Sequence, residues 1–270
     1  MKAPICRPRT DVSRVTAFRC RFSHFVDVSA RKPVMARMPQ TSTRQVRGPA
    51  HPRLCITDGT LEALKWVGLL LMAGDHINKY LLHEGNLALY ALGRLVMPIF
   101  GFVLMYNLAR PGAFASNMHI RVMQRLAVFA LLATPASVYL MGWWPLNILF
   151  TLFVATLLVW LLERDGLANR LAAAAVFLVG GAIVEFWWPA LLCCLGAWAF
   201  FRRPSVAGLA LWALAVASLA VVNGNFAALF ALPLVGGAAQ VDVPLRRSRW
   251  VFYAFYPAHL SLLALARSAL

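Results

Sequence analysis

The feature that most constrains this chain is a set of ionisable side chains inside one long apolar stretch, which runs from Leu61 to Tyr80. Within it, Lys65 and His76 lie eleven residues apart. At about 100° per residue, eleven steps return to the starting face of an α-helix with an offset of about 20°. The two groups are then separated by about 16 Å along the helix axis. Because ionisable groups are costly in lipid and usually face the protein interior or a wet cavity, this pair predicts a functional site.

The composition indicates a helical protein embedded in a membrane. The 270 residues are 61% hydrophobic and 13% charged, whereas soluble domains are about 45–50% apolar and 25% charged. From about residue 60 onward, apolar stretches follow one another, and most approach the roughly 20 residues that a spanning helix needs. We therefore expect an all-α, polytopic transmembrane helical bundle whose partner is the lipid bilayer. The net charge of +16 does not call for nucleic acid, because the basic residues fall in the N-terminal tail and in short loops.

Hydropathy predicts nine spans, and the charge of the connections predicts their direction. The second, fourth, sixth and eighth connections carry arginines, while the first, third, fifth and seventh contain no Lys or Arg. The positive-inside rule then places the N-terminus in the cytoplasm and the C-terminus outside, as expected of a multi-pass membrane protein. The sixth span is short, about 20 Å for 13 residues. The predicted spans are 59–83, 87–109, 122–141, 146–162, 170–187, 189–201, 205–222, 226–241 and 250–266.

Residues 1–56 differ in composition from the transmembrane domain expected over 57–270. They are rich in arginine and contain no apolar stretch long enough for the core of a signal peptide. Three interpretations compete for them: a disordered basic tail held by anionic lipid, an Arg-rich transit peptide, and a start codon placed too far upstream. We favour a tail or a misplaced start, and we assign no function to this segment.

Several polar residues share the predicted outer half of the membrane. With the N-terminus inside, His76 lies near the outer third of the first span and Lys65 near its cytoplasmic third. Structural ion pairs are the alternative interpretation, because Asp75 and Lys79 are spaced i,i+4 and can neutralise one another. His259 lies in the last span, after Pro257, which can kink the helix and free backbone carbonyls that would bind the imidazole. The residues expected in the outer half are Asp75, His76, Lys79, Arg94 and Glu185, with Asn147 at the start of the fourth span.

Other catalytic and metal-binding patterns are missing from the sequence. It contains no Gly-rich phosphate loop, no G-x-S-x-G motif and no zinc motif. Its five cysteines show no C-x-x-C spacing, and the adjacent Cys193 and Cys194 are expected to be small packing residues. We therefore predict neither a metal site nor a disulfide framework.

Two strings carry a family resemblance: Thr57-Asp-Gly-Thr-Leu-Glu-Ala-Leu-Lys-Trp66 leading to Asp75-His-Ile-Asn-Lys-Tyr80, and Gly93-Arg-Leu-Val-Met-Pro-Ile-Phe-Gly-Phe102 followed by Tyr106-Asn-Leu-Ala-Arg110. They resemble the TraX family, the F-pilin acetylases of conjugative plasmids and their chromosomal relatives. The likeness extends from about residue 56 to the end. More loosely, the chain resembles the wider integral-membrane acyltransferase group, whose first span has a basic residue, ten residues and then His, as Lys65 and His76 do here.

The resemblance implies transfer of an acetyl group, with acetyl-CoA as the expected donor. The expected acceptor is an amine such as a pilin N-terminus, a hydroxyl, or another periplasmic or surface group. Acyl transfer needs a base, which predicts His76 in that role, with His259 as the second candidate. Asp75 and Arg94 complete the candidate catalytic set, and Arg94 or Asn147 can donate to the developing oxyanion. Lys65 and Arg94 are the candidates for binding the donor, and the loop arginines, which include Arg121 and Arg247, are the alternative to Lys65 for its phosphates.

Two other classes of function compete with an enzyme. A transporter would place the same charged groups along a permeation path, and a paired set of broken helices would favour it. A non-catalytic membrane factor for pilin assembly would keep Lys65 and His76 merely packed. Loss of acyl transfer on replacement of His76 separates the enzyme from both alternatives.

Overall fold

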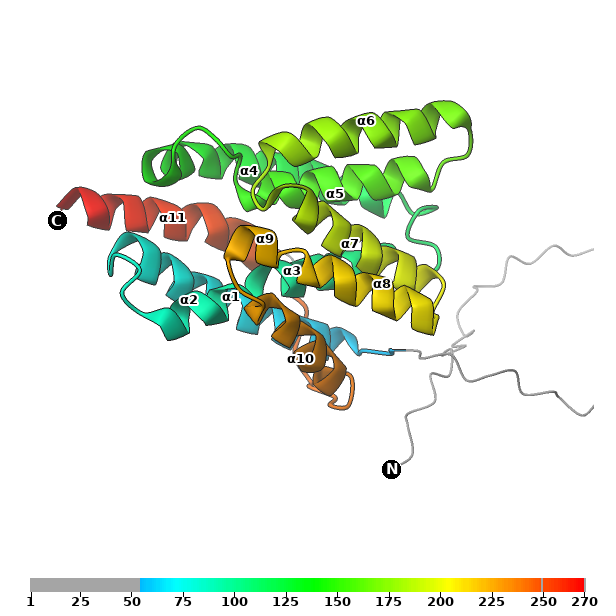
Figure 1. Ribbon diagram of the computed structural model, residues 1–270, viewed down its shortest axis with the longest axis horizontal. Coiled ribbons are helices and arrows are strands. Elements are labelled where there is room, and N and C mark those ends of the chain that lie inside the picture. The colour runs from blue at the N-terminus through cyan, green and yellow to red at the C-terminus, as the bar shows by residue number, and fades with distance from the viewer. Residues whose placement is uncertain (1–53, 249, 270) are drawn as a thin grey trace, which may run out of the picture. The chain divides into compact units, whose positions relative to one another are not determined.

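Helices make up nearly all of the regular structure in the computed structural model, which describes residues 54–248 and 250–269 (Figure 1). Over these residues, β structure is limited to one isolated bridge between Leu146 and Val184. The prediction of an all-α fold is thus confirmed. The predicted basic tail falls almost wholly on residues 1–53, which lie outside the described residues.

The helices follow the predicted hydrophobic segments, but three segments are interrupted. The second predicted span is split into α2 and α3 at Arg94 and Leu95, the seventh into α8 and α9, and the eighth into a 3-10 turn and α10. The elements are α1 (Asp58–Tyr80), α2 (Leu87–Gly93), α3 (Val96–Leu108), α4 (Met118–Met141), α5 (Ile148–Leu162), α6 (Leu167–Ile183), α7 (Trp187–Arg202), α8 (Val206–Ala217), α9 (Ala220–Asn223), η1 (Ala227–Phe230), α10 (Ala231–Ala238) and α11 (Val251–Ala269).

Three segments among the described residues are long and apolar enough to cross a membrane: Leu87–Leu108, Met118–Met141 and Val206–Asn223. Shorter apolar helices occupy Ile148–Leu162, Leu167–Ile183 and Ala227–Ala238. Helix α1 is long enough but carries several charged side chains, which lower its mean hydropathy. The helical segments and their apolar character are therefore as predicted, while the nine crossings and the cytoplasmic N-terminus stay predictions.

The centre of the bundle is α3, which packs against α7 on one side and α1 on the other. Its buried side chains include Ile99, Phe102 and Met105, all fully inaccessible. Helix α11 lies between α1 and α4, while α4, α5 and α6 form a layer that continues into α7 and α8 (Figure 1). This arrangement brings the last helix of the chain against the first, and the candidate site lies where they meet.

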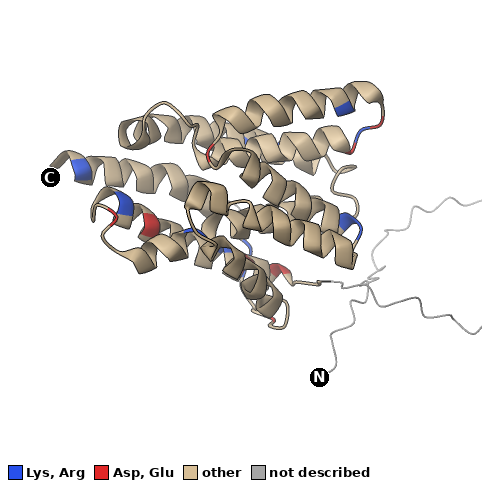
Figure 2. Ribbon diagram, in the orientation of Figure 1, with Lys and Arg blue, Asp and Glu red and all other residues tan. Residues whose placement is uncertain are grey.

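The segment before α11 crosses the start of α1. The Thr60 hydroxyl donates to the Val241 carbonyl at 2.8 Å and accepts from the Val243 amide at 3.2 Å. Gly59 makes this crossing possible, because a Cβ at that position would overlap the Val243 carbonyl. The segment therefore holds residues 247 and 248 over the first turns of α1. Figure 2 shows that the charged residues of the bundle lie mostly towards the ends of its helices.

Candidate functional site

The two histidines that the sequence singled out are in direct contact. Nδ1 of His76 on α1 lies 2.7 Å from Nε2 of His259 on α11. Their rings are nearly parallel, with 8° between the planes and 4.9 Å between the centroids. Nδ1 of His259 lies 3.0 Å from the Phe255 carbonyl oxygen, one turn earlier on the same helix.

This chain of contacts fixes which nitrogens carry protons in the neutral pair. A carbonyl oxygen only accepts hydrogen bonds, so His259 must donate through Nδ1. Its Nε2 is then unprotonated and accepts a hydrogen bond from Nδ1 of His76. Nε2 of His76 is left without a proton. The geometry therefore makes this atom the available base, and it makes His259 the group that orients it.

Pro257 is not the source of the carbonyl that holds His259. A proline in a helix frees the carbonyl four residues before it, here that of Tyr253. The hydrogen-bonded carbonyl is instead that of Phe255, whose ring also stacks on His259 with centroids 4.8 Å apart. The orientation of His259 thus comes from an ordinary helical position and a stacked neighbour.

Asp75 points away from the histidines and pairs with Arg94. One guanidinium nitrogen of Arg94 donates to both carboxylate oxygens of Asp75, at 2.8 and 2.9 Å, while its Nε donates to the Tyr90 carbonyl. The interpretation of Asp75 and Lys79 as mutual partners is therefore wrong. Lys79 is exposed, and its ammonium lies 5.5 Å from the centre of the Tyr80 ring.

A glycine explains why the distant partner of Asp75 prevails over the local one. A Cβ at Gly93 would overlap the Asp75 carboxylate, so the absence of a side chain there lets α2 approach α1 closely. Arg94 follows directly and completes the pair, with both side chains about 15% exposed. A bond between largely desolvated charges is stronger than an i,i+4 pair at a surface.

A cavity of about 560 Å³ opens between α1, α3, α4, α5 and α11. Its interior is apolar and includes Met72, Phe100 and Leu152, and its wall continues to Tyr256. Tyr256 also packs beside both histidines, with its ring centre 6.4 Å from that of His76 and 5.5 Å from that of His259. Neither histidine lines the cavity, which therefore reaches the histidine pair through the Tyr256 side chain.

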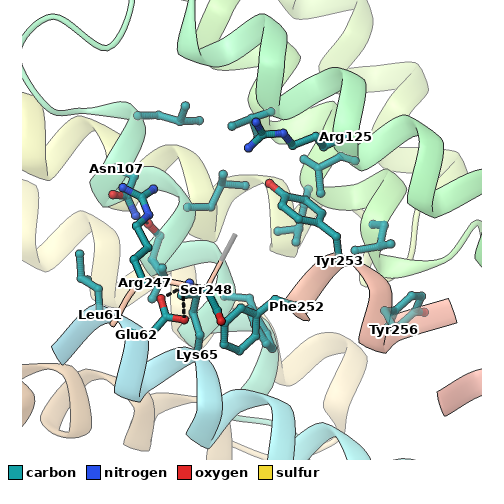
Figure 3. A pocket seen from close by; sticks show the side chains of 18 of the residues that line it. Leu61, Glu62, Lys65, Asn107, Arg125, Arg247, Ser248, Phe252, Tyr253 and Tyr256 are labelled. Atoms are coloured by element: carbon teal, nitrogen blue, oxygen red, sulfur yellow. Dashed lines mark hydrogen bonds and ion pairs between the residues drawn. The ribbon is translucent and has the colours of Figure 1, made fainter. Parts of the chain in front are cut away.

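Lys65 lines the cavity, as its position on the face of His76 predicts, but it is not free. Its ammonium lies 2.5 Å from a carboxylate oxygen of Glu62, whose other oxygen accepts from the Ser248 amide at 2.8 Å (Figure 3). The ammonium also lies 4.2 Å from the centre of the Phe252 ring. Glu62, which is 1% exposed, thus ties α1 to the segment before α11.

Three arginines line the same cavity without a carboxylate partner. Arg121 and Arg125 come from the first turns of α4, and Arg247 comes from the segment before α11. Figure 3 labels Arg125 and Arg247. No ion pair joins any of them to an acidic side chain in the part of the chain that the structure describes. The cavity therefore has a basic side and an apolar interior.

The acidic residues that line the cavity are both neutralised. Glu62 pairs with Lys65, and Asp58 accepts a hydrogen bond from Arg110 at 2.5 Å. This hydrogen bond and the charge of Arg110 hold the pKa of Asp58 below its usual value, although partial burial opposes them. An anionic ligand would therefore meet a surplus of positive charge.

The other predicted polar residues have structural partners. The Asn147 side chain caps α5 by accepting from the Leu149 amide and donates to the Ala130 carbonyl at 3.1 Å. Glu185 lies in the turn between α6 and α7, where its amide donates to the Leu146 carbonyl and its carbonyl accepts from Thr151. The structure thus brings together His76 and His259, and separately Asp75 and Arg94.

Sequence reasoning missed Glu62, Tyr256 and Arg125. Glu62 stands three residues before Lys65, a spacing that favours an ion pair on one helical face. Tyr256 stands three residues before His259, which places it on the same side of α11. Arg121 and Arg247 were among the loop arginines expected to serve the donor phosphates, and both line the cavity. No group of three or more His, Cys, Asp or Glu side chains among the described residues is arranged to hold a metal ion.

Comparison with known families gives a match to the TraX protein family over residues 60–267. The chain belongs to this family. The match runs from the first turn of α1 to the last turn of α11, so it includes both histidines, the Asp75–Arg94 pair and all the residues that line the cavity except Asp58. No curated protein and no solved structure shows significant similarity to the chain. Membership of the TraX family and the three long apolar helices together indicate association with a membrane.

Proposed function

We propose that this TraX-family protein is a multi-pass acyltransferase of the bacterial inner membrane. It transfers an acetyl group from acetyl-CoA to an amine, such as the N-terminus of a pilin, or to a hydroxyl of another periplasmic or surface acceptor. The observation that carries the proposal is the hydrogen-bonded pair of His76 and His259, which leaves one imidazole nitrogen unprotonated beside a ligand-sized cavity.

The cavity supports a CoA thioester as the donor. Its volume of about 560 Å³ falls within the range of about 300–1,000 Å³ that is typical of small-molecule sites. Arg121, Arg125 and Arg247 provide guanidinium groups of the kind that bind phosphates, and the apolar interior suits the uncharged arm of the donor. Lys65 adds to this charge from α1, although Glu62 shares it.

The residues divide the chemistry between them. The donor supplies an activated thioester. Nε2 of His76 takes the proton from the attacking amine or hydroxyl, a step typically worth about 10²–10⁴ in rate. His259 keeps His76 in the required tautomer and stabilises its protonated form, and the Phe255 carbonyl holds His259 in turn.

Asp75 and Arg94 act indirectly, by positioning His76. Their ion pair joins α1 to α2 immediately before His76 in the sequence, so it fixes where that imidazole stands. Arg94 does not line the cavity, and its donors already serve Asp75 and Tyr90. We therefore propose a positioning role for the pair in place of donor binding.

Two measurements test the proposed function. The first compares, by mass spectrometry, the acetylation of periplasmic and surface material from cells with and without the gene, complemented by wild type or by His76→Ala. The second follows release of free CoA thiol from acetyl-CoA by the purified protein in proteoliposomes, with glycinamide as the probe amine. We expect wild type to act in both assays and His76→Ala to act in neither.

A matched control separates catalysis from general damage. His83 lies exposed in the connection after α1, so His83→Ala should leave both signals unchanged. A wild-type protein that neither binds acetyl-CoA nor alters acetylation would overturn the proposal. A transporter or an assembly factor would then explain the buried polar groups better.

A further inference from the structure

Tyr256 is a polar side chain that lies between the cavity and the histidine pair. It lines the cavity, is 2% exposed, and its ring packs against both His76 and His259. Met72 lies in the same wall but carries no hydrogen-bond donor. A carbonyl that reaches His76 from the cavity must therefore pass beside the Tyr256 ring.

Acyl transfer requires a donor for the oxyanion, and the candidates chosen from the sequence are engaged elsewhere. Arg94 is bonded to Asp75 and Tyr90, and Asn147 caps α5 and donates to Ala130. Neither residue lines the cavity. Lys65, which does line it, is held by Glu62.

Other hydroxyl groups near the site are less well placed. Tyr80 lies beside His76, and its hydroxyl is buried without a hydrogen-bond partner, but it does not line the cavity. Tyr253 lines the cavity one turn earlier on α11, where its ring stacks on Phe129 with centroids 5.6 Å apart. Tyr256 alone among these three lies both on the cavity and beside His259.

The surroundings of Tyr256 leave its proton available. The hydrogen bonds of the described residues include none from the Tyr256 hydroxyl to a side chain or a carbonyl, although the Glu185 carboxylate lies near enough to act on it electrostatically. The hydroxyl therefore keeps a donor for a ligand.

We propose that the Tyr256 hydroxyl is a catalytic residue that donates a hydrogen bond to the oxyanion formed on the thioester carbonyl. This inference rests on the proposed acyltransferase function and adds a residue to its machinery. A phenol is protonated at neutral pH, so Tyr256 can donate without prior activation. A donor in a site shielded from water stabilises developing charge more strongly than water does.

The step balances as follows for an amine acceptor. The nitrogen lone pair attacks the carbonyl carbon, a C–N bond forms, and the carbonyl π electrons move to oxygen, where Tyr256 stabilises them. Nε2 of His76 takes one proton from the nitrogen. When the oxyanion collapses, the C–S bond breaks, and the CoA sulfur leaves with the electron pair and receives that proton. The products are the amide and free CoA.

The test compares Tyr256→Phe with Tyr139→Phe in proteoliposomes, with acetyl-CoA as donor and glycinamide as acceptor. Both changes remove one hydroxyl and keep the ring, but Tyr139 is exposed on α4 and does not line the cavity. We expect Tyr256→Phe to lower kcat by about 10²–10³, as loss of one oxyanion donor does elsewhere. The Kd for acetyl-CoA and the unfolding temperature should stay close to wild type, and Tyr139→Phe should retain kcat.

A second substitution covers the case in which Tyr256→Phe does not fold. Difluorotyrosine at position 256 keeps the ring and the hydroxyl but ionises at lower pH. Because a phenolate cannot donate, we expect kcat to decline at a lower pH than in wild type, an effect absent when the same residue replaces Tyr139.

The outcomes separate the two proposals. Equal kcat for Tyr256→Phe and Tyr139→Phe, or an unchanged pH profile with difluorotyrosine, would overturn the role of Tyr256 while leaving the acyltransferase intact. A wild-type protein that releases no CoA thiol would overturn the proposed function and this inference with it.

Discussion

Nδ1 of His76 lies 2.7 Å from Nε2 of His259, although 183 residues separate them in the sequence. The contact joins the first helix of the bundle to the last, which pack side by side. A hydrogen bond between two neutral imidazoles requires one donor and one acceptor. Because His259 donates through Nδ1 to the Phe255 carbonyl, His259 is the acceptor in this bond and His76 is the donor. The two histidines therefore have different roles, and their substitutions should have different effects.

His76→Ala should abolish most acetyl transfer, because it removes the base, whose contribution is typically about 10²–10⁴ in rate. His259→Ala should cost less, because His76 keeps its nitrogen but loses the group that fixes its tautomer. Rates of CoA thiol release by the purified variants measure both effects. If His259→Ala proved the more damaging change while both variants stayed folded, the assigned order of the pair would be reversed.

Gly93→Ala should destabilise the protein by about 1–3 kcal/mol, the usual cost of overpacking. The added Cβ would overlap the Asp75 carboxylate and push α2 away from α1. Thermal unfolding in detergent measures the change. Gly236→Ala is the matched control, because it adds the same methyl group to α10 with no atom within 4 Å. A Gly93→Ala protein as stable as this control would show that the close approach is not needed.

The sequence predicted the helices and the helix that carries the site, because both depend on local patterns. Apolar stretches of about 20 residues mark the helical segments, and the eleven-residue spacing placed Lys65 and His76 on one face of α1. Lys65 lines the cavity, whereas His76 does not line it and lies beside Tyr256, which does. His259 was recognised as a candidate, but no local pattern indicates that it lies against His76.

The choice of ionic partners was the part that the sequence did not reveal. Spacing suggested Asp75 with Lys79, because i,i+4 pairs are neighbours on a helix surface. Such pairs contribute only about 0.2–0.5 kcal/mol, so a tertiary partner easily displaces them. Arg94 does so here, because Gly93 brings its helix close. The effect of the missing Cβ at Gly93 can be predicted only when it is known which helix packs against that position.

Lys65→Ala should both weaken acetyl-CoA binding and destabilise the protein. Glu62 is 1% exposed, and removing one partner of a buried pair typically costs about 3–5 kcal/mol. Lys65→Arg should be milder, because the charge is kept. The double variant Glu62→Gln, Lys65→Ala should regain stability, since no unpaired carboxylate remains. Unfolding temperatures and the Kd for acetyl-CoA measure these effects. If the double variant also regained full donor affinity, Lys65 would have no direct part in binding the donor.

Arg121→Gln, Arg125→Gln and Arg247→Gln should each raise the Kd for acetyl-CoA about tenfold. A hydrogen bond to a charged group contributes about 1.5–3 kcal/mol, and about 1.4 kcal/mol corresponds to a factor of ten. The loss should shrink at high salt, which screens the wild-type interaction.

Arg267→Gln is the control for these three substitutions. Arg267 lies in the last turn of α11, where it donates to the Leu140 carbonyl, and it does not line the cavity. Binding that is equally weak in this control would mean that net charge, and not the arginine cluster, sets the donor affinity.

Reporter fusions should show the periplasm at Gly85 and at Leu270, and the cytoplasm at Gly112, because connections rich in arginine stay inside. Gly85 follows α1 and Gly112 follows α3, so these two fusions test the first two crossings. A cytoplasmic signal at Leu270 would mean that one later segment does not cross.

Helix α7 has 16 residues, about 24 Å, which is longer than the predicted sixth span. The segment Ala227–Ala238 is shorter than α7 and begins with a 3-10 turn, so it is the segment most easily left out of the membrane. A fusion at Gln240 would show whether this segment crosses.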